Sequence, residues 1–269
     1  MKNIFLLTHF LILACIVQAQ VLPALPTKPN SVPEKKQDSK TQNIVSNDRD
    51  GDGLTNTVDR CPDQNGPVSN YGCPIEKKKN YNKVTIGGQV WMQENLNVVR
   101  FRNGDPIPEA SGEEEWERYG IEGKPAWCFY DNDPANGRIY GKLYNWYAVT
   151  DPRGLAPSGW HIPTDMEWSR LIDYLGGEKV AWGKLKSLNH WKDINEGGAT
   201  VSSGFSGLPG GYRNANGSFN FIGNYGYWWS STEIDKYNAW IRYLFDNYAN
   251  VYRGYYSKEL GCSVRCVRD

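Results

Sequence analysis

All 11 tryptophans and all 17 tyrosines of this 269-residue chain lie at or beyond Tyr71. Large aromatic side chains bury much apolar area and dominate the energetics of protein cores. The stretch from residue 20 to residue 70 has few apolar side chains, so it cannot bury enough surface to offset chain entropy. We therefore predict a single globular domain over residues 76–269, preceded by segments that lack a core.

The first nineteen residues have the pattern of a secretory signal peptide. Lys2 gives a basic start, residues 4–17 are almost wholly apolar, and small side chains precede a cleavage point after Ala19. A competing interpretation is lipid attachment, because residues 12–15 resemble a bacterial lipoprotein box in which Cys15 would be lipidated. In both cases we expect an exported protein, either secreted or held at the outer membrane or cell surface.

Residues 20–46 are predicted to be a disordered linker. Proline recurs between residues 22 and 33, and residues 34–40 are all polar. Such a composition favours an extended spacer that holds the remainder away from a surface. The alternative is an inert N-terminus of the mature chain.

Charge balance argues against nucleic acid as a partner, and hydropathy argues against a membrane span. Lys and Arg number 30 against 30 Asp and Glu, so no excess of positive charge is present to neutralise a nucleic-acid backbone. After the signal peptide no apolar run of about 18 residues remains, so we expect no transmembrane helix.

Residues 48–59 have the ligand spacing of an EF-hand calcium loop. Acidic side chains fall at loop positions 1, 3, 5 and 12, and Gly53 at position 6 permits the sharp turn that such loops need. Without a cation, three aspartates within five residues would repel one another. The alternative is a solvated Asp/Gly-rich turn. The predicted cofactor is calcium, and the predicted ligands are Asp48, Asp50, Asp52, the carbonyl of Leu54, Asn56 and Asp59.

The wider segment 47–75 is similar to a thrombospondin type 3 repeat, which implies calcium-stiffened structure without a core. Cys61 and Cys73 are near enough in sequence to form a disulfide, and an exported chain meets oxidising conditions.

Local patterns in the domain predict an α+β fold with few helices and long ordered loops. Residues 85–92 read as two strands around the turn Gly87-Gly88. Thr164 and Glu167 form a capping box that starts a helix ending near Gly176, with an apolar face of Trp168, Leu171, Ile172 and Leu175. Further elements are predicted as a helix at 178–188 and strands at 126–130, 239–245, 251–256 and 263–267.

Six segments carry a family resemblance, and they occur in the order Gly87–Asn97, Tyr140–Val149, Gly159–Trp168, Leu208–Arg213, Tyr227–Glu233 and Ser263–Arg268. Together they span residues 81–269 and resemble the Fibrobacter succinogenes major paralogous domain. This resemblance implies an exported or surface-located protein.

A second resemblance concerns the fold alone. The helix start at Pro163–Trp168 and the ending Gly261–Arg265 are similar to those of the formylglycine-generating enzyme superfamily. That similarity implies a C-type-lectin-like core, and it is an analogy of fold rather than of activity.

The domain contains three cysteines. The family resemblance favours a disulfide between Cys128 and Cys266, which leaves Cys262 unpaired. A Cys262–Cys266 bridge is disfavoured because residues four apart on a strand lie too far apart.

No complete catalytic constellation is present, so we expect the protein not to be an enzyme. The enzymatic alternative uses Cys262 or Cys266 as the reactive cysteine of a formylglycine-generating-like enzyme. His161 is interpreted as a packed core histidine. Asp165 and Glu167 are explained by helix N-terminal electrostatics and capping.

The aromatic residues permit two interpretations. Trp146, Trp168, Trp228 and Trp240 are predicted to lie in the core. Part of the stretch 205–257 is rich in Tyr, Asn and Gly, which adaptable recognition surfaces use. The predicted ligand-binding residues are Tyr212, Arg213, Asn216, Tyr225, Tyr227 and Trp229.

The sequence thus predicts an exported, calcium-binding surface protein whose lectin-like domain recognises glycan or protein, for example in adhesion. The alternatives are the enzyme described above and a purely structural protein of the cell envelope.

Overall fold

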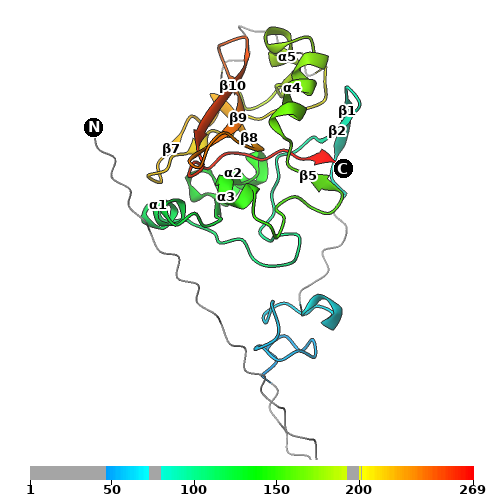
Figure 1. Ribbon diagram of the computed structural model, residues 1–269, viewed down its shortest axis with the longest axis vertical. Helices are drawn as coiled ribbons and strands as arrows, with labels where there is room; N and C mark the ends of the chain where they lie inside the picture. The colour runs from blue at the N-terminus through cyan, green and yellow to red at the C-terminus, as the bar shows by residue number, and fades with distance from the viewer. Residues whose placement is uncertain (1–46, 73–79, 193–199, 201) are drawn as a thin grey trace, which may run out of the picture. The chain divides into compact units, whose positions relative to one another are not determined.

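The computed structural model describes residues 47–72, 80–192, 200 and 202–269, and all that follows concerns these residues (Figure 1). The predicted signal peptide, the predicted linker, Cys15 and Cys73 lie outside them. Within the described part of the chain, no helix is both long and apolar enough to cross a membrane.

The domain that begins at residue 80 is a mixed α+β structure with short helices and mostly antiparallel strands, as predicted. Its helices are α1 (Glu113–Ile121), α2 (Pro134–Tyr140), α3 (Trp146–Val149), α4 (Asp165–Tyr174) and α5 (Glu178–Leu185), with a 3-10 turn at Tyr130–Asn132. Its strands are β1 (Lys83–Ile86), β2 (Gln89–Met92), β3 (Trp127–Cys128), β4 (Leu143–Tyr144), β5 (Trp160–His161), β6 (Tyr212–Arg213), β7 (Phe219–Asn220), β8 (Tyr225–Glu233), β9 (Asn238–Phe245), β10 (Val251–Ser257) and β11 (Val267–Arg268).

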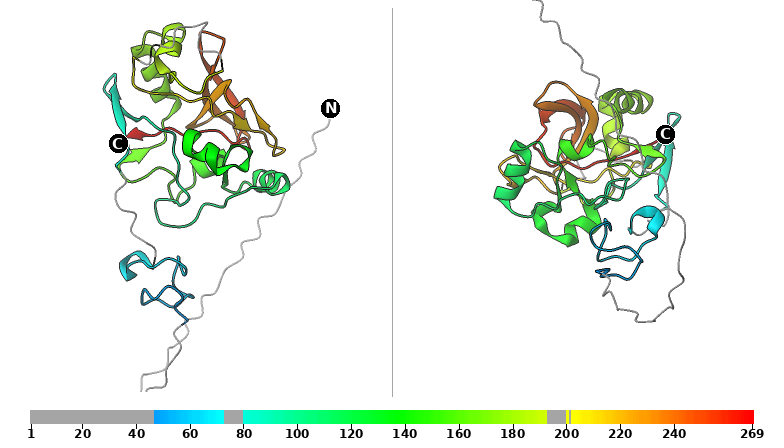
Figure 2. Two further views of the ribbon diagram at one scale, coloured as in Figure 1. Left: turned by 180° about the vertical axis from the view of Figure 1, so that it is seen from behind. Right: turned by 60° about the horizontal axis from the view of Figure 1, so that its bottom comes forward.

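The longest strands form an antiparallel sheet in the order β10-β9-β8. Helices α4 and α5 pack against it, as the views in Figures 1 and 2 agree. Trp228, Leu244 and Val251 project from the covered face into a core cluster that they share with α4 and α5. Alternation along the strands places Tyr227, Tyr243 and Tyr252, which are cross-strand neighbours, on the opposite face.

A second sheet brings the two ends of the domain together. Its order is β1-β2-β11-β5, so the C-terminal strand lies between the N-terminal hairpin and β5. Gly87 and Gly88 both have positive φ, 57° and 80°. Two such residues form the turn that matches the twist of a two-residue hairpin, so the predicted hairpin is confirmed.

Helix α4 begins with the predicted capping box. The Thr164 side chain accepts from the Glu167 N–H, and the Glu167 carboxylate accepts from the Thr164 N–H at 2.8 Å. The four apolar residues of the predicted face are all buried. Gly176, at a φ of 103°, follows the last turn, as predicted.

Other predicted elements are shorter than expected. The strand predicted at 126–130 is β3 alone, and of the strand predicted at 263–267 only Val267 belongs to β11. Residues 263–266 instead pass between sheets: Ser263 bridges Trp228 of β8, whereas the Cys266 carbonyl accepts from the Met92 N–H of β2. Single contacts to different partners do not build one continuous strand.

Trp146, Trp168 and Trp228 are buried, as predicted, but Trp240 is not part of the core. It is half-buried, and its ring lies 3.5 Å from the Arg253 guanidinium carbon. Trp240 lies on the central strand β9 and packs against Tyr255 of the edge strand β10, with ring centroids 5.8 Å apart.

The structure corrects the disulfide prediction for the domain. Cys128, Cys262 and Cys266 are all free thiols, and all are buried. Cys128 pairs with Leu143 of β4, whereas Tyr144 of β4 bridges Cys262 on its other side. Strand β4 therefore separates Cys128 from the C-terminal segment, and adjacent strands already lie about 4.8 Å apart. Cys266 lies four residues further along, and the bridge does not form.

Candidate functional sites

The loop at 48–59 is organised by its own aspartates. The Asp48 carboxylate accepts from the Gly51 and Gly53 N–H groups at 2.8 and 3.0 Å, and the Leu54 N–H donates to Asp52 Oδ1 at 2.9 Å. Gly51 and Gly53 have φ of 76° and 96°, a region that glycine adopts without strain. The turns bring one carboxylate oxygen from each of Asp48, Asp50 and Asp52 to within 4.8 Å of one another.

Asp59 adds a fourth carboxylate beside this group. It is only 8% exposed, and its Oδ1 accepts from the Cys61 N–H at 2.7 Å. A Cβ at Gly72 would lie 2.1 Å from Asp59 Oδ1 and 2.8 Å from Asp52 Oδ2, so the two carboxylates share the space beside this glycine. Asp59 Oδ2 and Asp50 Oδ2 are both buried and have no hydrogen-bond partner among the described residues.

The pKa of Asp50 also reflects the crowding of carboxylates in this loop. Desolvation, followed by the negative charges of Asp52 and Asp59, raises the pKa of Asp50 above its ordinary value. Hydrogen bonds from backbone N–H groups oppose this rise only in part. The folded loop therefore holds carboxylates closer than their charges favour.

Two further predicted ligands, Asn56 and Leu54, form hydrogen bonds within the segment. Asn56 Oδ1 accepts from the Arg49 N–H at 2.9 Å, and its Nδ2 donates to Asn47 Oδ1 at 3.2 Å. In this structure the Asn56 side chain therefore fixes the ends of the loop. Leu54 donates its N–H to Asp52, as described above. Cys61 is buried in the same segment, and the predicted Cys61–Cys73 bridge stays a prediction because Cys73 lies outside the described residues.

The predicted ligand-binding residues of the domain separate into two groups. Arg213 and Trp229 are fully buried, which corrects their assignment to a surface. Arg213 donates to the carbonyls of Ala110, Gly112 and Gly217, and Trp229 Nε1 donates to the Tyr144 carbonyl at 2.8 Å. Tyr227 is 5% exposed. The other three, Tyr212, Asn216 and Tyr225, are half-buried or exposed.

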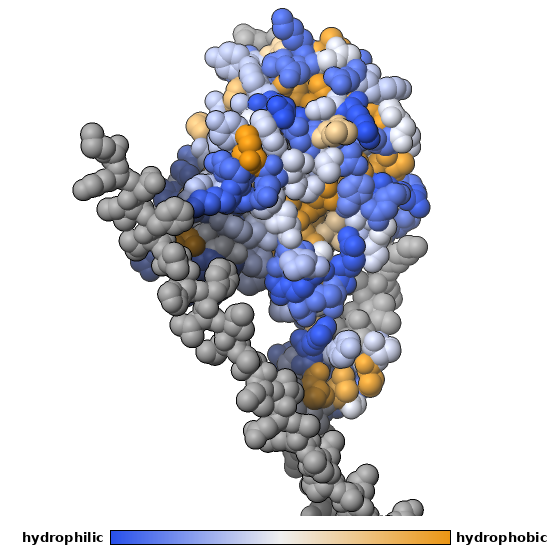
Figure 3. Space-filling model, viewed as in Figure 1, coloured by the Kyte–Doolittle hydropathy of each residue, from blue (hydrophilic) through white to orange (hydrophobic). Residues whose placement is uncertain are grey.

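Tyr212 and Tyr225 belong to a contiguous group of rings on the face of the β8–β10 sheet opposite α4 and α5, which we call the aromatic cluster. Part of this face, including Tyr227, is packed into a second core cluster. Tyr243 stacks between Tyr227 and Tyr252, with ring centroids 5.3 and 5.2 Å away. Hydrophilic residues cover most of the face drawn in Figure 3, and apolar ones form scattered patches. The cluster consists of Tyr212, Phe221, Tyr225, Tyr227, Tyr243, Phe245, Tyr248, Tyr252 and Tyr256.

A cavity of about 640 Å³ lies elsewhere, beside the segment that follows β2. Its walls come from residues 81–82, 93–97, 137–141 and 206–208. Sequence reasoning did not single out this groove. The run Gln93–Asn97, with amide and carboxylate side chains close together, was the available signal.

Asn95 forms a buried junction beneath the groove. Its Oδ1 accepts from Arg265 Nε and Nη2 and from Trp228 Nε1, at 3.1, 2.7 and 2.9 Å. Its Nδ2 donates to the Tyr140 carbonyl at 2.9 Å and to Ser263 Oγ at 3.2 Å. One amide thus joins four segments that are far apart in the sequence.

A family model, described as the Fibrobacter succinogenes major domain, matches residues 84–268. The chain belongs to this family. Neither curated proteins nor solved structures gave a match. In this major domain the resemblance segments meet in space, because Asn95, Tyr140, Trp228 and Arg265 come from four of them. These four residues therefore have a structural role, since they form one buried, hydrogen-bonded junction.

The three thiols of the major domain are buried, and burial changes their acidity. Burial raises the pKa of Cys128 to about 12 and that of Cys266 to about 12, and it raises the pKa of Cys262 further still. The reactive form of cysteine is the thiolate, so these thiols are poor nucleophiles while buried.

His161 lies between two carboxylates. The interpretation of His161 as a packed core histidine was therefore wrong. Its Nδ1 is 2.8 Å from Asp269 Oδ1, its Nε2 is 2.8 Å from Glu167 Oε1, and its side chain is 36% exposed. Partial burial lowers the pKa of His161, but hydrogen bonds and charges from both carboxylates outweigh it and raise the pKa on balance.

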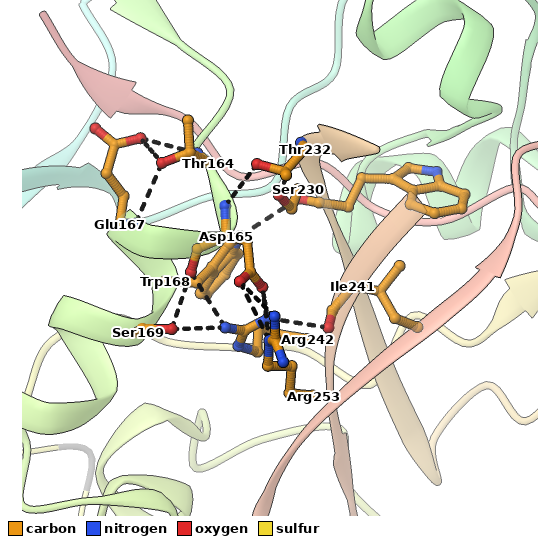
Figure 4. Close-up of polar contacts among 11 residues, drawn as sticks. Thr164, Asp165, Glu167, Trp168, Ser169, Ser230, Thr232, Ile241, Arg242 and Arg253 are labelled. Atoms are coloured by element: carbon orange, nitrogen blue, oxygen red, sulfur yellow. Dashed lines mark hydrogen bonds and ion pairs between the residues drawn. The ribbon is translucent and has the colours of Figure 1, made fainter. Parts of the chain in front are cut away.

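Asp165 joins α4 to the sheet, as Figure 4 shows. Arg242 Nη1 donates to Asp165 Oδ1 at 2.5 Å, and Arg253 Nη2 donates to Asp165 Oδ2 at 2.9 Å. The prediction that Asp165 serves the helix N-terminus electrostatically omitted these two guanidinium groups. Their hydrogen bonds satisfy the carboxylate, so Asp165 has a structural role.

Proposed function

We propose that this protein is an exported, calcium-binding surface protein whose major domain recognises a ligand without catalysing a reaction. The observation that carries the calcium proposal is the meeting of three carboxylates within 4.8 Å beside the buried, unpartnered oxygen of Asp59. Calcium prefers hard oxygen ligands in flexible arrangements of six to eight. The loop offers oxygen ligands. Desolvation and, after it, the charges of Asp52 and Asp59 raise the pKa of Asp50, and a divalent cation would offset those charges.

The finer assignments belong to the same proposal. The segment 47–75 acts as a thrombospondin type 3-like, calcium-stiffened spacer, held together by its cation and by a Cys61–Cys73 disulfide. The domain has a C-type-lectin-like core, which its few helices, long loops and paired chain ends support. Display of such a domain at the cell surface suits glycan or protein recognition and adhesion.

A binding role is better supported than an enzymatic one. The aromatic cluster offers rings that are amphipathic and conformationally stiff, properties that recognition surfaces use. The enzymatic alternative needs an accessible reactive cysteine, whereas all three thiols of the domain are buried. A purely structural envelope role would leave the cluster without a ligand.

Isothermal titration calorimetry tests the calcium proposal. The purified protein, first stripped with EGTA, should release or absorb heat on calcium addition, and Asp50→Ala combined with Asp52→Ala should abolish the signal. Asp63→Asn is the matched control, because Asp63 lies in the same segment, is exposed and pairs only with Arg49. Absence of calcium binding by the unaltered protein, or equal binding by the double variant, would overturn the proposal.

A further inference from the structure

We propose that the groove beside residues 93–97 is a saccharide-binding site that holds vicinal hydroxyl groups of a short oligosaccharide. The inference rests on the proposed recognition role of the domain and assigns it a location and a ligand class. At about 640 Å³ the cavity has the size typical of small-molecule sites.

The first argument is the set of hydrogen-bonding groups at the groove. Asn82 Nδ2 donates to Glu94 Oε1 at 2.7 Å, which orients both side chains. Gln93 Nε2 donates to the Gly204 carbonyl at 3.1 Å. Among the described residues, Glu94 Oε2, Asn82 Oδ1 and Gln93 Oε1 have no hydrogen-bond donor. Three acceptors from neighbouring planar groups suit adjacent sugar hydroxyls, which donate as well as accept.

The second argument is charge and polarity. Glu94 supplies one negative charge to the lining and Arg138 one positive charge, and no ion pair of the described residues involves either side chain. Tyr81, Ile139 and Leu208 add apolar surface. A saccharide presents hydroxyl edges and apolar C–H faces, so it matches a lining of this mixed kind. A strongly anionic ligand would meet the Glu94 carboxylate.

The third argument is rigidity. Arg265 is fully buried beneath the groove and donates to the carbonyls of Met92, Gln93 and Phe205 as well as to Asn95. These bonds hold the backbone that carries Gln93 and Glu94. A site that is fixed before binding loses less entropy when the ligand arrives.

The aromatic cluster is less suited to this ligand. A sugar packs its C–H face on the face of a ring, but the faces of Tyr243 are occupied by Tyr227 and Tyr252, with interplanar angles of 23° and 11°. The faces of the central ring are therefore not available to a sugar. We therefore assign the saccharide to the groove and not to the aromatic cluster.

Saturation-transfer-difference NMR and calorimetry with the purified protein test the site. The probes are neutral trisaccharides of gluco, xylo, manno and galacto configuration, with a galacturonate trisaccharide as the acidic member. At least one neutral probe should bind. Glu94→Gln and Arg138→Ala should each weaken its Kd at least tenfold, with the melting temperature measured to show that the variants fold.

Two controls separate the possible results. Glu114→Gln makes the same chemical change at an exposed position of α1 and should leave Kd unchanged. Tyr252→Ala alters the aromatic cluster. Loss of saccharide binding in Tyr252→Ala with none in Glu94→Gln would overturn the groove but preserve the recognition role. Failure of every probe to bind would overturn the groove, while the calcium titration decides the loop separately.

Discussion

At the scale of single residues, Asn95 explains why segments from the whole length of the domain converge. It is 7% exposed, and both ends of its carboxamide are fully used by buried partners. Burial lowers the pKa of Arg265 to about 9, so its guanidinium depends on the oxygens around it. A buried charge without such partners is strongly destabilising.

Asn95→Leu should therefore destabilise the protein by about 3 kcal/mol, because it removes the acceptor of Trp228 Nε1 and one of several acceptors of Arg265 while leaving both donors buried. Urea denaturation followed by tryptophan fluorescence measures the loss. Asn247→Leu is the matched control, since Asn247 is exposed on the β9–β10 loop, and it should cost no more than about 0.5 kcal/mol. Similar losses in both variants would contradict the junction role.

His161 gives a prediction of pH dependence. Its pKa is raised on balance in the folded state, although partial burial opposes the rise, so folding favours the imidazolium. The stabilisation is fully present below the unfolded pKa, about 6.5, and disappears as the pH rises through the folded value. His161→Gln should therefore cost more stability at pH 5.5 than at pH 8.5. The difference should be below about 1 kcal/mol because the side chain is partly exposed.

Denaturation curves of both proteins at the two pH values measure this effect. Asp269→Asn should retain part of the pH dependence, because Glu167 still accepts from His161. A larger cost of His161→Gln at pH 8.5 would show that the sign is wrong.

Residue assignments succeeded where the pattern is local. The capping box of Thr164 and Glu167 follows from a three-residue spacing and was predicted correctly. Arg213 and Trp229 were misplaced because nothing local distinguishes a buried arginine from an exposed one. Two of the three carbonyls that accept from the Arg213 guanidinium lie about a hundred positions earlier in the chain, and no local pattern reveals them.

At the scale of elements, the contact between α4 and the sheet depends on Asp165. The carboxylate is shared by Arg242, whose side chain is 3% exposed, and Arg253, whose side chain is 44% exposed. Asp165→Asn should cost about 3 kcal/mol, since it leaves the buried Arg242 without its counter-charge. Arg253→Ala should cost about 1 kcal/mol or less, because exposed ion pairs contribute little.

Thermal and urea denaturation of the two variants check this ranking. A cost for Arg253→Ala that equals or exceeds the cost for Asp165→Asn would mean that the exposed pair, not the buried one, holds α4 on the sheet.

Local pairing helped the prediction of elements but did not suffice, because β8 pairs with its sequence neighbour β9 and was not predicted. The β1–β2 hairpin, the β9 and β10 strands and α4 all close through neighbours in the sequence, and all were predicted. Strand β11 was predicted too long and without its partners. Those partners, Trp91 and His161, lie more than a hundred residues away, and no periodicity encodes such a pairing.

At the scale of the whole molecule, the boundary between the aspartate-rich segment and the aromatic domain was predictable because the two parts differ in composition. Aromatic residues build the domain, and the aspartate spacing of 48–59 brings its carboxylates together in the structure. The groove was not predicted, because its walls come from four segments that only tertiary packing assembles. The Cys128–Cys266 pairing, which the family resemblance favoured, failed because strand β4 lies between Cys128 and the C-terminal segment.

The state of the thiols tests the enzymatic alternative, which needs a reactive cysteine. Cys128, Cys262 and Cys266 are free and buried, and their raised pKa values keep them protonated at neutral pH. An alkylating reagent reacts with thiolates that it can reach. We therefore expect iodoacetamide to leave the three thiols of the native domain unmodified over a time in which free cysteine reacts completely.

Intact-mass spectrometry after three treatments measures this outcome on the same protein. Native labelling should add nothing at these three residues, denaturation without reductant should expose all three of them, and reduction should add Cys61 and Cys73 if the spacer is disulfide-bonded. Peptide mapping assigns each label to its residue. Rapid native labelling of Cys262 or Cys266 would show an accessible, activated thiol and would favour the formylglycine-generating-like enzyme over a recognition domain. Complete protection, followed by full labelling on unfolding, would leave that enzyme without its nucleophile.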